Sequence, residues 1–402
     1  MSVTSDPLEG VLLEGRYRVE ARIATGGMST VYRGLDVRLD RPVALKVMDA
    51  RYANDSQFLT RFQREARAVA RLKDPGLVAV YDQGLDDTHP FLVMELVEGG
   101  TLRELLRERG PMPPHAAAAV LRPVLGGLAV AHHAGLVHRD VKPENVLISD
   151  DGEVKLVDFG LVRAVAEAGI TSTSVILGTA AYLSPEQVGS GVADARSDVY
   201  AVGILAYELI TGATPFTGDN PLTVAYQRMD NDVPPPSAAI SGVPPQFDEF
   251  VARATARDPA ARFADAEEMA EDLDAIAREL ALPKFRVPAP KNSAQHAAAT
   301  AFHSRLTEQP TTAAPPAVKN PTRQLTRDPA DWQPDPDPAP ADDEYANIAR
   351  HFAGIEITDF IWERQRARRA LAFWALIVLI LTGLVAAGAW TLGTNLQALI
   401  GQ

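Results

Sequence analysis

Cysteine is absent from the whole chain of 402 residues. Its absence excludes disulfides, thiolate nucleophiles and cysteine-based zinc or iron–sulfur sites. Any catalysis must therefore use oxygen groups, nitrogen groups or a bound metal. An excess of positive charge is also missing, because 39 basic residues stand against 52 acidic ones and the net charge is −13. This balance argues against a protein that coats nucleic acid by neutralising its phosphates.

A secretory signal is missing as well. The N-terminal sequence MSVTSDPLEG has neither a basic start nor an apolar core, so we expect the front of the chain to lie in the cytoplasm. What the chain does have is an ordinary globular composition, 46% hydrophobic and 23% charged. Length and composition predict two compact units and additional linker.

The front of the chain predicts a small β-rich lobe, and the part that follows predicts a larger helical lobe. Three runs between Arg16 and Met48 alternate apolar and polar residues, which is typical of antiparallel strands. Asp55 can cap a helix. The buried stripe of that helix is expected to be Phe58, Phe62, Ala66 and Val69. Strand-like runs follow at 77–81 and 90–96, and helical composition dominates 101–134 and 197–282.

The composition changes at residue 283. Segment 283–343 is rich in proline, alanine, threonine and aspartate, which predicts a disordered linker. Apolar residues return in segment 344–369, which is either a short amphipathic juxtamembrane helix or the loosely collapsed end of the linker. Segment 370–392 carries no charge and, as a helix, would be roughly 34 Å long, enough to cross a bilayer.

Segment 370–392 is therefore predicted to be a transmembrane helix. The alternative is a buried core helix, but such a helix needs a domain around it. Trp374 and Trp390 suit the two interfaces, and the arginines just before the span place its N-terminal side in the cytoplasm. These arginines are Arg364, Arg366, Arg368 and Arg369. The tail at 393–402 is too short to fold into a sensor domain.

The first candidate for chemistry is the glycine-containing turn ATGGMSTV at 24–31. Missing side chains let backbone N–H groups approach phosphates there, but an ordinary hairpin turn has the same composition. Ala24 and Ser29 also stand where a G-x-G-x-x-G pattern has glycine. Lys46 ends a strand beside this turn. Glu65 lies on or beside the apolar stripe of the next helix, where a carboxylate needs a cationic partner, and we expect Lys46 to be that partner.

The strongest motif is HRDVKPEN at 138–145, followed by a strand, a turn, a strand and the triplet DFG at 158–160. It holds two carboxylates and a carboxamide on short loops, which is the oxygen-rich set that Mg²⁺ and a proton-accepting base need. Each residue alone is a common turn former. Their joint occurrence in this order makes chance a poor explanation.

These motifs occur in the order of the Hanks-type, eukaryotic-like protein kinases, and the chain resembles that family from about residue 16 to residue 282. Segments such as GGMSTVYRGLD and GTAAYLSPEQ are similar to those of actinobacterial transmembrane serine/threonine kinases. The resemblance implies a two-lobed α+β kinase fold. It also implies transfer of the ATP γ-phosphate to serine or threonine of protein substrates, with Mg²⁺, or alternatively Mn²⁺, as the metal.

The resemblance also implies roles for the residues that match the motifs. Lys46 would hold the α- and β-phosphates and pair with Glu65, and Asp140 would accept the proton of the substrate hydroxyl. Lys142, as in the serine/threonine branch, would steady the transferring phosphoryl group. The metal ligands would be Asn145 and Asp158.

ATP is expected to bind between the glycine turn and a hinge that meets adenine through its backbone. The expected ATP-binding residues are Ile23, Ala24, Thr25, Gly26, Gly27, Met28, Ser29, Thr30, Val31, Lys46, Met94, Glu95 and Val97. Two further pairings are structural. Glu186, in the sequence Ser-Pro-Glu, is expected to pair with Arg262, and Asp198 is expected to brace the catalytic loop.

Regulation is expected at Thr171 and Thr173. In the family, a basic residue in the place of Arg139 commonly pairs with a phosphate on this segment and orders it. A flexible, hydroxyl-rich loop is the plain alternative. Thr179 stands where the family has a threonine that contacts the catalytic loop, so we assign it a structural role.

The predicted protein is a single-pass plasma-membrane kinase with a cytoplasmic kinase domain, able to autophosphorylate and to pair through that domain. The predicted parts are a tail at 1–15, the kinase domain at 16–282, the linker at 283–343, a juxtamembrane segment at 344–369, the span at 370–392 and an outer tail at 393–402. A membrane-tethered pseudokinase scaffold is the alternative, favoured only by the substituted glycine turn. A receptor for an extracellular ligand would need an outer domain.

Overall fold

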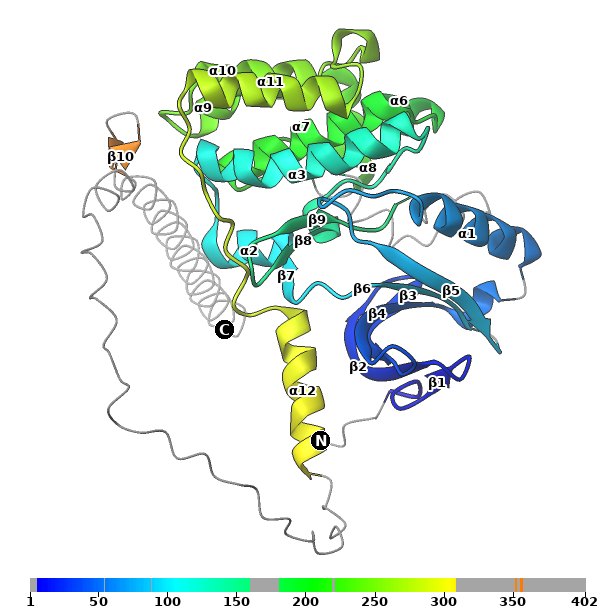
Figure 1. Cartoon of the computed structure of the whole chain (residues 1–402). Coiled ribbons are helices and arrows are strands. Elements are labelled where there is room, and N and C mark those ends of the chain that lie inside the picture. The colour runs from blue at the N-terminus through cyan, green and yellow to red at the C-terminus, as the bar shows by residue number, and fades with distance from the viewer. Residues whose placement is uncertain are drawn as a thin grey trace, which may run out of the picture. The chain divides into compact units, whose positions relative to one another are not determined.

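The computed structural model describes residues 6–53, 55–87, 89–159, 181–218, 221–308, 351–352 and 355–356. The chain divides into two units, Met1–Pro315 and Pro316–Gln402. The first unit contains the predicted β-rich lobe and helical lobe (Figure 1). In the second unit, the described residues form two short antiparallel strands, β10 (His351–Phe352) and β11 (Ile355–Glu356), where a juxtamembrane helix was one of two expectations.

The small lobe is built on a six-stranded sheet with the order β1-β2-β3-β4-β6-β5. Its strands are β1 (Leu12–Leu13), β2 (Tyr17–Thr25), β3 (Ser29–Asp36), β4 (Arg41–Met48), β5 (Val80–Asp86) and β6 (His89–Glu95). Helix α1 (Ser56–Val69) packs on this sheet through buried Phe58 and Phe62. Asp55 caps it by accepting hydrogen bonds from the backbone N–H groups of Gln57 and Phe58, as predicted.

The expected N-terminal tail is wrong for residues 6–15. β1 pairs with β2 at the edge of the sheet, and Leu13 is only 1% exposed. The Tyr32 hydroxyl donates a hydrogen bond of 3.1 Å to the carboxylate of Asp6. The segment is therefore part of the small lobe, because burying Leu13 removes apolar surface from water.

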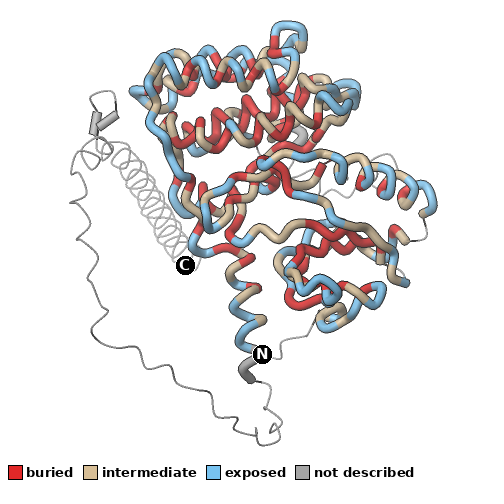
Figure 2. The backbone as a smooth tube through the Cα atoms, viewed as in Figure 1, coloured by how far each residue is buried: buried red, intermediate tan, exposed pale blue. Residues whose placement is uncertain are grey.

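The large lobe is mostly helical and surrounds two buried helices, α3 and α7 (Figure 2). In the described part of this lobe the α-helices are α2 (Leu102–Arg109), α3 (Pro114–His133), α6 (Pro185–Ser190), α7 (Ala195–Thr211), α8 (Pro221–Asp230), α9 (Pro236–Ala239), α10 (Pro245–Ala254) and α11 (Ala266–Glu279). A small sheet of β7 (Gly99–Thr101), β8 (Val146–Ser149) and β9 (Val154–Leu156) faces the small lobe. The described residues also form three short 3₁₀ helices: η1 (Ala50–Tyr52) follows β4 of the small lobe, and η2 (Pro143–Asn145) and η3 (Pro259–Ala261) lie in the large lobe.

Among the described residues, one helix is long and apolar enough to cross a membrane, and it is α3. Most of α3 is buried in the large lobe, where Leu121, Val124 and Leu125 are fully buried. It is therefore a core helix of the lobe. The predicted transmembrane segment, 370–392, lies outside the described residues.

The expected linker is wrong for residues 283–308. Val287 is 2% exposed, and the chain continues into helix α12 (Ala294–Glu308), in which Ala298 is 4% exposed. Proline-rich composition indicated disorder, but this part of the segment packs within the first unit. The rest of the expected linker, 309–343, lies outside the described residues.

Candidate active site

A cavity of about 500 Å³ is lined by residues of both lobes. The ATP-binding residues predicted from the sequence that line it are Ile23, Ala24, Thr25, Gly26, Ser29, Val31, Lys46, Met94, Glu95 and Val97. Three residues of the same turn, Gly27, Met28 and Thr30, do not line it. Met28 instead packs against the apolar cluster beneath α1, and its carbonyl accepts a hydrogen bond of 2.9 Å from the Asp49 N–H.

The glycine turn is the tight connection between β2 and β3. The Gly26 N–H donates a hydrogen bond of 2.8 Å to the carbonyl of Ser29, which closes the turn. The β3–β4 register places Val31 opposite Lys46. The structure therefore brings the turn and the lysine to the same cavity, and Ala24 and Ser29 do not prevent this.

Lys46 differs from the prediction in its partner. Its Nζ lies 2.7 Å from Oδ1 of Asp158, and no ion pair with Glu65 is found between these two described side chains. Asp158 follows β9 with a φ of 72°, a strained conformation for a non-glycine residue. Burial alone would raise the pKa of Asp158, but the ammonium of Lys46 outweighs burial and lowers that pKa.

Glu65 nevertheless lies close to the same region. It lines a small cavity together with Met94, Asp158 and Phe159. The helix position predicted from the apolar stripe is therefore correct, whereas the pairing with Lys46 is not made in this structure. The pairing depends on how α1 sits against β4, which the sequence of α1 alone does not determine.

The catalytic loop forms one hydrogen-bonded group around Asp140, which is 6% exposed. Lys142 Nζ donates to both carboxylate oxygens of Asp140, at 2.9 and 2.8 Å. Asn145 Nδ2 donates to the backbone carbonyl of Asp140 at 2.7 Å and to its Oδ2 at 3.0 Å. Lys142 and Asn145 line the cavity, so the loop places all three predicted residues together.

Asp198 braces this loop, as predicted. Its carboxylate is fully buried and accepts hydrogen bonds from the backbone N–H groups of His138 at 2.8 Å and Arg139 at 2.7 Å. Arg139 has a φ of 70°, so these bonds hold a strained peptide. His132 Nε2 lies 2.9 Å from the same carboxylate. The conformation of the catalytic loop is thus fixed from α7.

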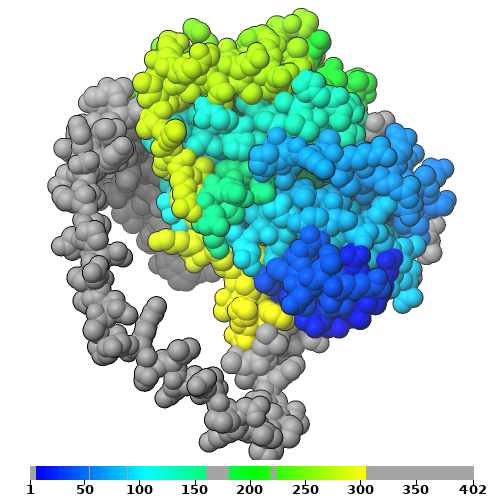
Figure 3. Space-filling model, in the orientation of Figure 1, coloured from blue at the N-terminus to red at the C-terminus, as the bar shows by residue number. Residues whose placement is uncertain are grey.

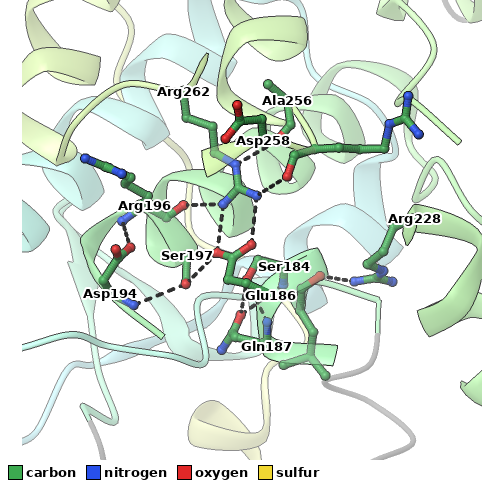
Figure 4. A network of polar contacts seen from close by, with 12 residues as sticks. Ser184, Glu186, Gln187, Asp194, Arg196, Ser197, Arg228, Ala256, Asp258 and Arg262 are labelled. Carbon is green, nitrogen blue, oxygen red and sulfur yellow. Dashed lines mark hydrogen bonds and ion pairs between the residues drawn. The ribbon is translucent and has the colours of Figure 1, made fainter. Parts of the chain in front are cut away.

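The predicted pair of Glu186 and Arg262 is confirmed, and it is the centre of a larger network (Figure 4). Arg262 is fully buried at its side chain and makes two parallel bonds of 2.8 Å to the Glu186 carboxylate. Its remaining donors reach the backbone carbonyls of Ala256, Arg196 and Arg257. All five guanidinium donors are therefore used. Burial opposes the charge on Glu186, but the bonds from Arg262 and Ser197 lower its pKa to about 2.

The residues predicted to bind metal fit a hard divalent cation. Asn145 uses its amide nitrogen in the bonds to Asp140, which leaves its carbonyl oxygen as a ligand. Asp158 supplies a carboxylate, and both residues line the same cavity. Oxygen donors of this kind suit Mg²⁺. No cluster of three or more histidine, aspartate or glutamate side chains with metal-binding geometry occurs in the described part of the chain.

Some cavity residues were not predicted. Thr101 and Glu104 belong to a capping box at the start of α2, a signal that the sequence T-x-x-E could have given. Gln295 also lines the cavity, from beyond the expected kinase domain. Nothing in the local sequence marks Gln295, because its place depends on how 283–308 packs.

The predicted phosphorylation sites, Thr171 and Thr173, lie in 160–180 and therefore outside the described residues, as do Gly160 and Thr179. Arg139 is described, and its backbone carbonyl accepts a hydrogen bond of 3.4 Å from Gln187 Nε2. The bond joins the catalytic loop to α6, which follows that segment.

Comparisons with known proteins agree with this geometry. The family model described as "Protein kinase domain" matches residues 17–273. The chain is 70% identical over 398 residues to the serine/threonine-protein kinase PknL of Mycobacterium bovis, and the aligned region covers 99% of each of the two chains. It is 45% identical over 267 residues to PknB of Mycobacterium tuberculosis, covering 65% of this chain and 43% of that protein.

A solved structure supports the fold. The crystal structure of the Mycobacterium tuberculosis PknI kinase domain matches with a TM-score of 0.53 and 30% identity, covering 68% of this chain and 99% of that one. The match in fold, the family model and the high identity over nearly the whole length lead to one conclusion. The chain belongs to the protein kinase family and is a serine/threonine-protein kinase.

Proposed function

We propose that this kinase is anchored in the plasma membrane, transfers the γ-phosphate of ATP to serine or threonine of protein substrates, and phosphorylates its own segment at 160–180. One observation carries the catalytic part of the proposal. Asp140, Lys142 and Asn145 form one hydrogen-bonded group, and two of its members, Lys142 and Asn145, line the cavity that Lys46 also lines. A pseudokinase scaffold has no chemical need for this group.

The cavity offers a distinct place for each part of ATP. The hinge at 94–97 would meet adenine, and the β2–β3 turn with Lys46 would meet the phosphates, as the family resemblance implies. Asn145 and Asp158 would hold Mg²⁺, which, when bound, neutralises charge on the phosphates. Lys46 must then exchange Asp158 for phosphate oxygens and for Glu65, because the lysine–glutamate pair is required in active protein kinases.

The transfer step would use the catalytic loop. The hydroxyl of the substrate loses its proton to Asp140 as its oxygen bonds to the γ-phosphorus, and the bond from phosphorus to the leaving oxygen of ADP breaks. The ammonium of Lys142, within 3 Å of Asp140, stabilises the negative charge that develops on the transferring group. Asn145 orients Asp140 through its two hydrogen bonds.

Regulation and location are supported by the sequence. A phosphate on Thr171 or Thr173 carries about −1.5 to −2 charges near neutral pH, enough to attract the guanidinium of Arg139. The apolar segment 370–392 and the arginines before it favour a single membrane span with the kinase domain inside. A dimer through the kinase domain would let one copy phosphorylate the other.

The experiment compares the full chain in detergent with Asp140→Asn in the presence of Mg²⁺ and γ-labelled ATP. We expect Asp140→Asn to lose transfer by a factor of about 10² to 10⁴, while Asp87→Asn in an exposed turn keeps it. ATP binding without any transfer by the wild-type chain would favour the scaffold instead. Mapping of phosphate on the wild-type chain tests Thr171 and Thr173.

Location is tested separately. Membranes from expressing cells are washed with alkaline carbonate, and intact cells are treated with protease. We expect the chain to stay with the membrane, a variant lacking 370–392 to be released, and the kinase domain to be protected. Recovery of the full-length chain in the soluble fraction would reject the membrane span.

A further inference from the structure

Gln295, in the first turn of α12, has a buried side chain with unused hydrogen-bonding capacity. The residue is 6% exposed. Its Nε2 and Oε1 atoms are both buried and have no hydrogen-bond partner among the described residues. Gln295 lines the same cavity as the hinge residues Glu95 and Val97. A buried carboxamide without partners is costly, so its presence at this place points to a polar ligand in the cavity.

The segment before α12 holds this glutamine in place. We call residues 283–293 the C-terminal strap. Arg286 Nε donates to the carbonyl of Asp151 at 2.7 Å, and the Lys291 N–H donates to the carboxylate of Glu108 at 2.8 Å. At its end, the N–H of Ala294 donates to the carboxylate of Glu104 at 2.9 Å. The strap is thus attached to the large lobe at several points along its length.

The first turn of α12 is equally well anchored. Ser293 Oγ accepts a hydrogen bond of 3.0 Å from the His296 N–H, and His296 Nε2 lies 3.0 Å from the carboxylate of Asp150. A Cβ at Gly100, next to the hinge, would lie 2.5 Å from Pro290 Cγ, so the strap approaches the backbone closely there. α12 itself contacts β2 of the small lobe. Figure 3 shows the strap and α12, in yellow, against both lobes.

We propose that Gln295 is a nucleotide-recognition residue that hydrogen-bonds the ribose hydroxyls of ATP in this cavity. Lys46 and Asp158 mark the phosphate end, and the hinge marks the adenine end. Gln295 shares the cavity with Thr101 and Glu104, which follow the hinge. A carboxamide offers one donor group and one acceptor, which matches the two neighbouring hydroxyls of a ribose. The inference rests on ATP binding as proposed above, and it adds a residue from beyond the segment 17–273 that matches the kinase family.

The test measures binding and kinetics of the full chain with Gln295→Leu and Gln295→Ala. Titration calorimetry with ADP and 2′-deoxy-ADP avoids turnover. We expect the Kd for ADP and the KM for ATP to rise about 5- to 10-fold, since up to two hydrogen bonds are lost, with kcat unchanged. The preference of the wild type for ADP over 2′-deoxy-ADP should shrink in both variants. Gln57→Leu, at an exposed position, is the matched control and should behave as wild type.

Each outcome is decisive once thermal melting shows that either variant is folded. An unchanged Kd for ADP rejects the assignment of Gln295. A lower Kd in the variants also rejects it, because Gln295 would then obstruct the nucleotide. A raised Kd with an unchanged preference for ADP over 2′-deoxy-ADP rejects the ribose as the group that is contacted. Failure of the wild-type chain to bind any nucleotide would instead reject the proposed function itself.

Discussion

The two sides of the nucleotide cavity differ in how completely they are assembled. On the large-lobe side, Asp140 is bonded to Lys142 and Asn145, and the loop is held by the buried carboxylate of Asp198. On the small-lobe side, Lys46 pairs with Asp158, a residue expected to bind metal. The contacts of the catalytic loop are therefore already formed. The small-lobe side must rearrange before phosphate can be transferred, because Lys46 must leave Asp158.

The physical cause of this difference is the kind of contact on each side. The loop is fixed by several short hydrogen bonds to buried groups, and breaking any of them leaves a buried polar atom unsatisfied. Lys46 has one carboxylate partner among the described residues, and that partner, Asp158, keeps 27% of its side chain exposed. An exchange of partners by Lys46 therefore requires far less free energy than a movement of the catalytic loop.

The largest effect is expected from Arg262→Ala on the large-lobe side. The change removes both guanidinium bonds to the carboxylate of Glu186 and the donors to three backbone carbonyls. Removing one partner of a buried ion pair costs about 3 to 5 kcal/mol, which urea unfolding would measure. Arg122→Ala removes an exposed pair with Asp274 and is the control, with an expected cost of at most about 1 kcal/mol. Equal costs for both changes would show that the network is not a stabilising centre.

A smaller effect is expected from Asp198→Asn. A carboxamide has one acceptor oxygen in place of two, so it cannot accept from both His138 N–H and Arg139 N–H in the present geometry. An unsatisfied buried N–H costs about 1 to 3 kcal/mol. The strained Arg139 should then relax, and kcat should fall more than KM for ATP changes. Full kcat in a folded Asp198→Asn chain would contradict the bracing role.

The pH dependence of stability tests the same network more finely. Glu186 has its pKa lowered to about 2, so its contribution is complete above its ordinary pKa near 4.5 and is lost as the pH falls towards 2. The difference in unfolding free energy between the wild type and Glu186→Gln should therefore be constant near neutral pH and shrink below about pH 4.5. A difference that stays constant down to pH 3 would show that the pair does not hold the proton off Glu186.

The smallest change in stability is expected from Glu65→Gln on the small-lobe side. Glu65 is only partly buried, and glutamine keeps the size and shape of glutamate, so the free energy of unfolding should change by less than about 1 kcal/mol. Phosphate transfer should nevertheless fall, because the active arrangement needs this pair. Glu271→Gln, at an exposed position on α11, is the control. Normal transfer by Glu65→Gln would show that the small-lobe side does not use this residue.

The sequence predicted the large-lobe side better than the small-lobe side, for a physical reason. The large-lobe contacts need particular residue types, namely a carboxylate with a cation or with backbone N–H groups. The residue types of the motif at 138–145, of Asp198 and of Glu186 therefore indicate their partners. The partner of Lys46 depends on where α1 and Asp158 sit relative to β4. That placement is set by the tertiary structure. The carboxylates of Asp158 and Glu65 both lie in this region, so either could be the partner of Lys46.

The ends of the kinase domain were missed for a different reason. Residues 6–15 and 283–308 are both held by contacts with residues far away in the sequence. Leu13 supplies such a contact at one end, and at the other the strap uses backbone and charged groups, including those of Arg286 and Lys291. Composition reports how apolar a segment is, and it does not report which distant groups the segment will meet.

We expect the large-lobe side of the cavity to stay fixed while the small-lobe side moves. Because the chain has no cysteine, pairs of engineered cysteines can carry spin labels without background. The first pair, Gln63→Cys with Leu39→Cys, reports the distance between α1 and the exposed β3–β4 turn. The second pair, Val192→Cys with Glu271→Cys, reports a distance within the large lobe. Distances are measured with and without ADP and Mg²⁺, before and after incubation with ATP and Mg²⁺. We expect the first distance to shift and the second to stay constant; a constant first distance, or equal shifts in both, would contradict the account.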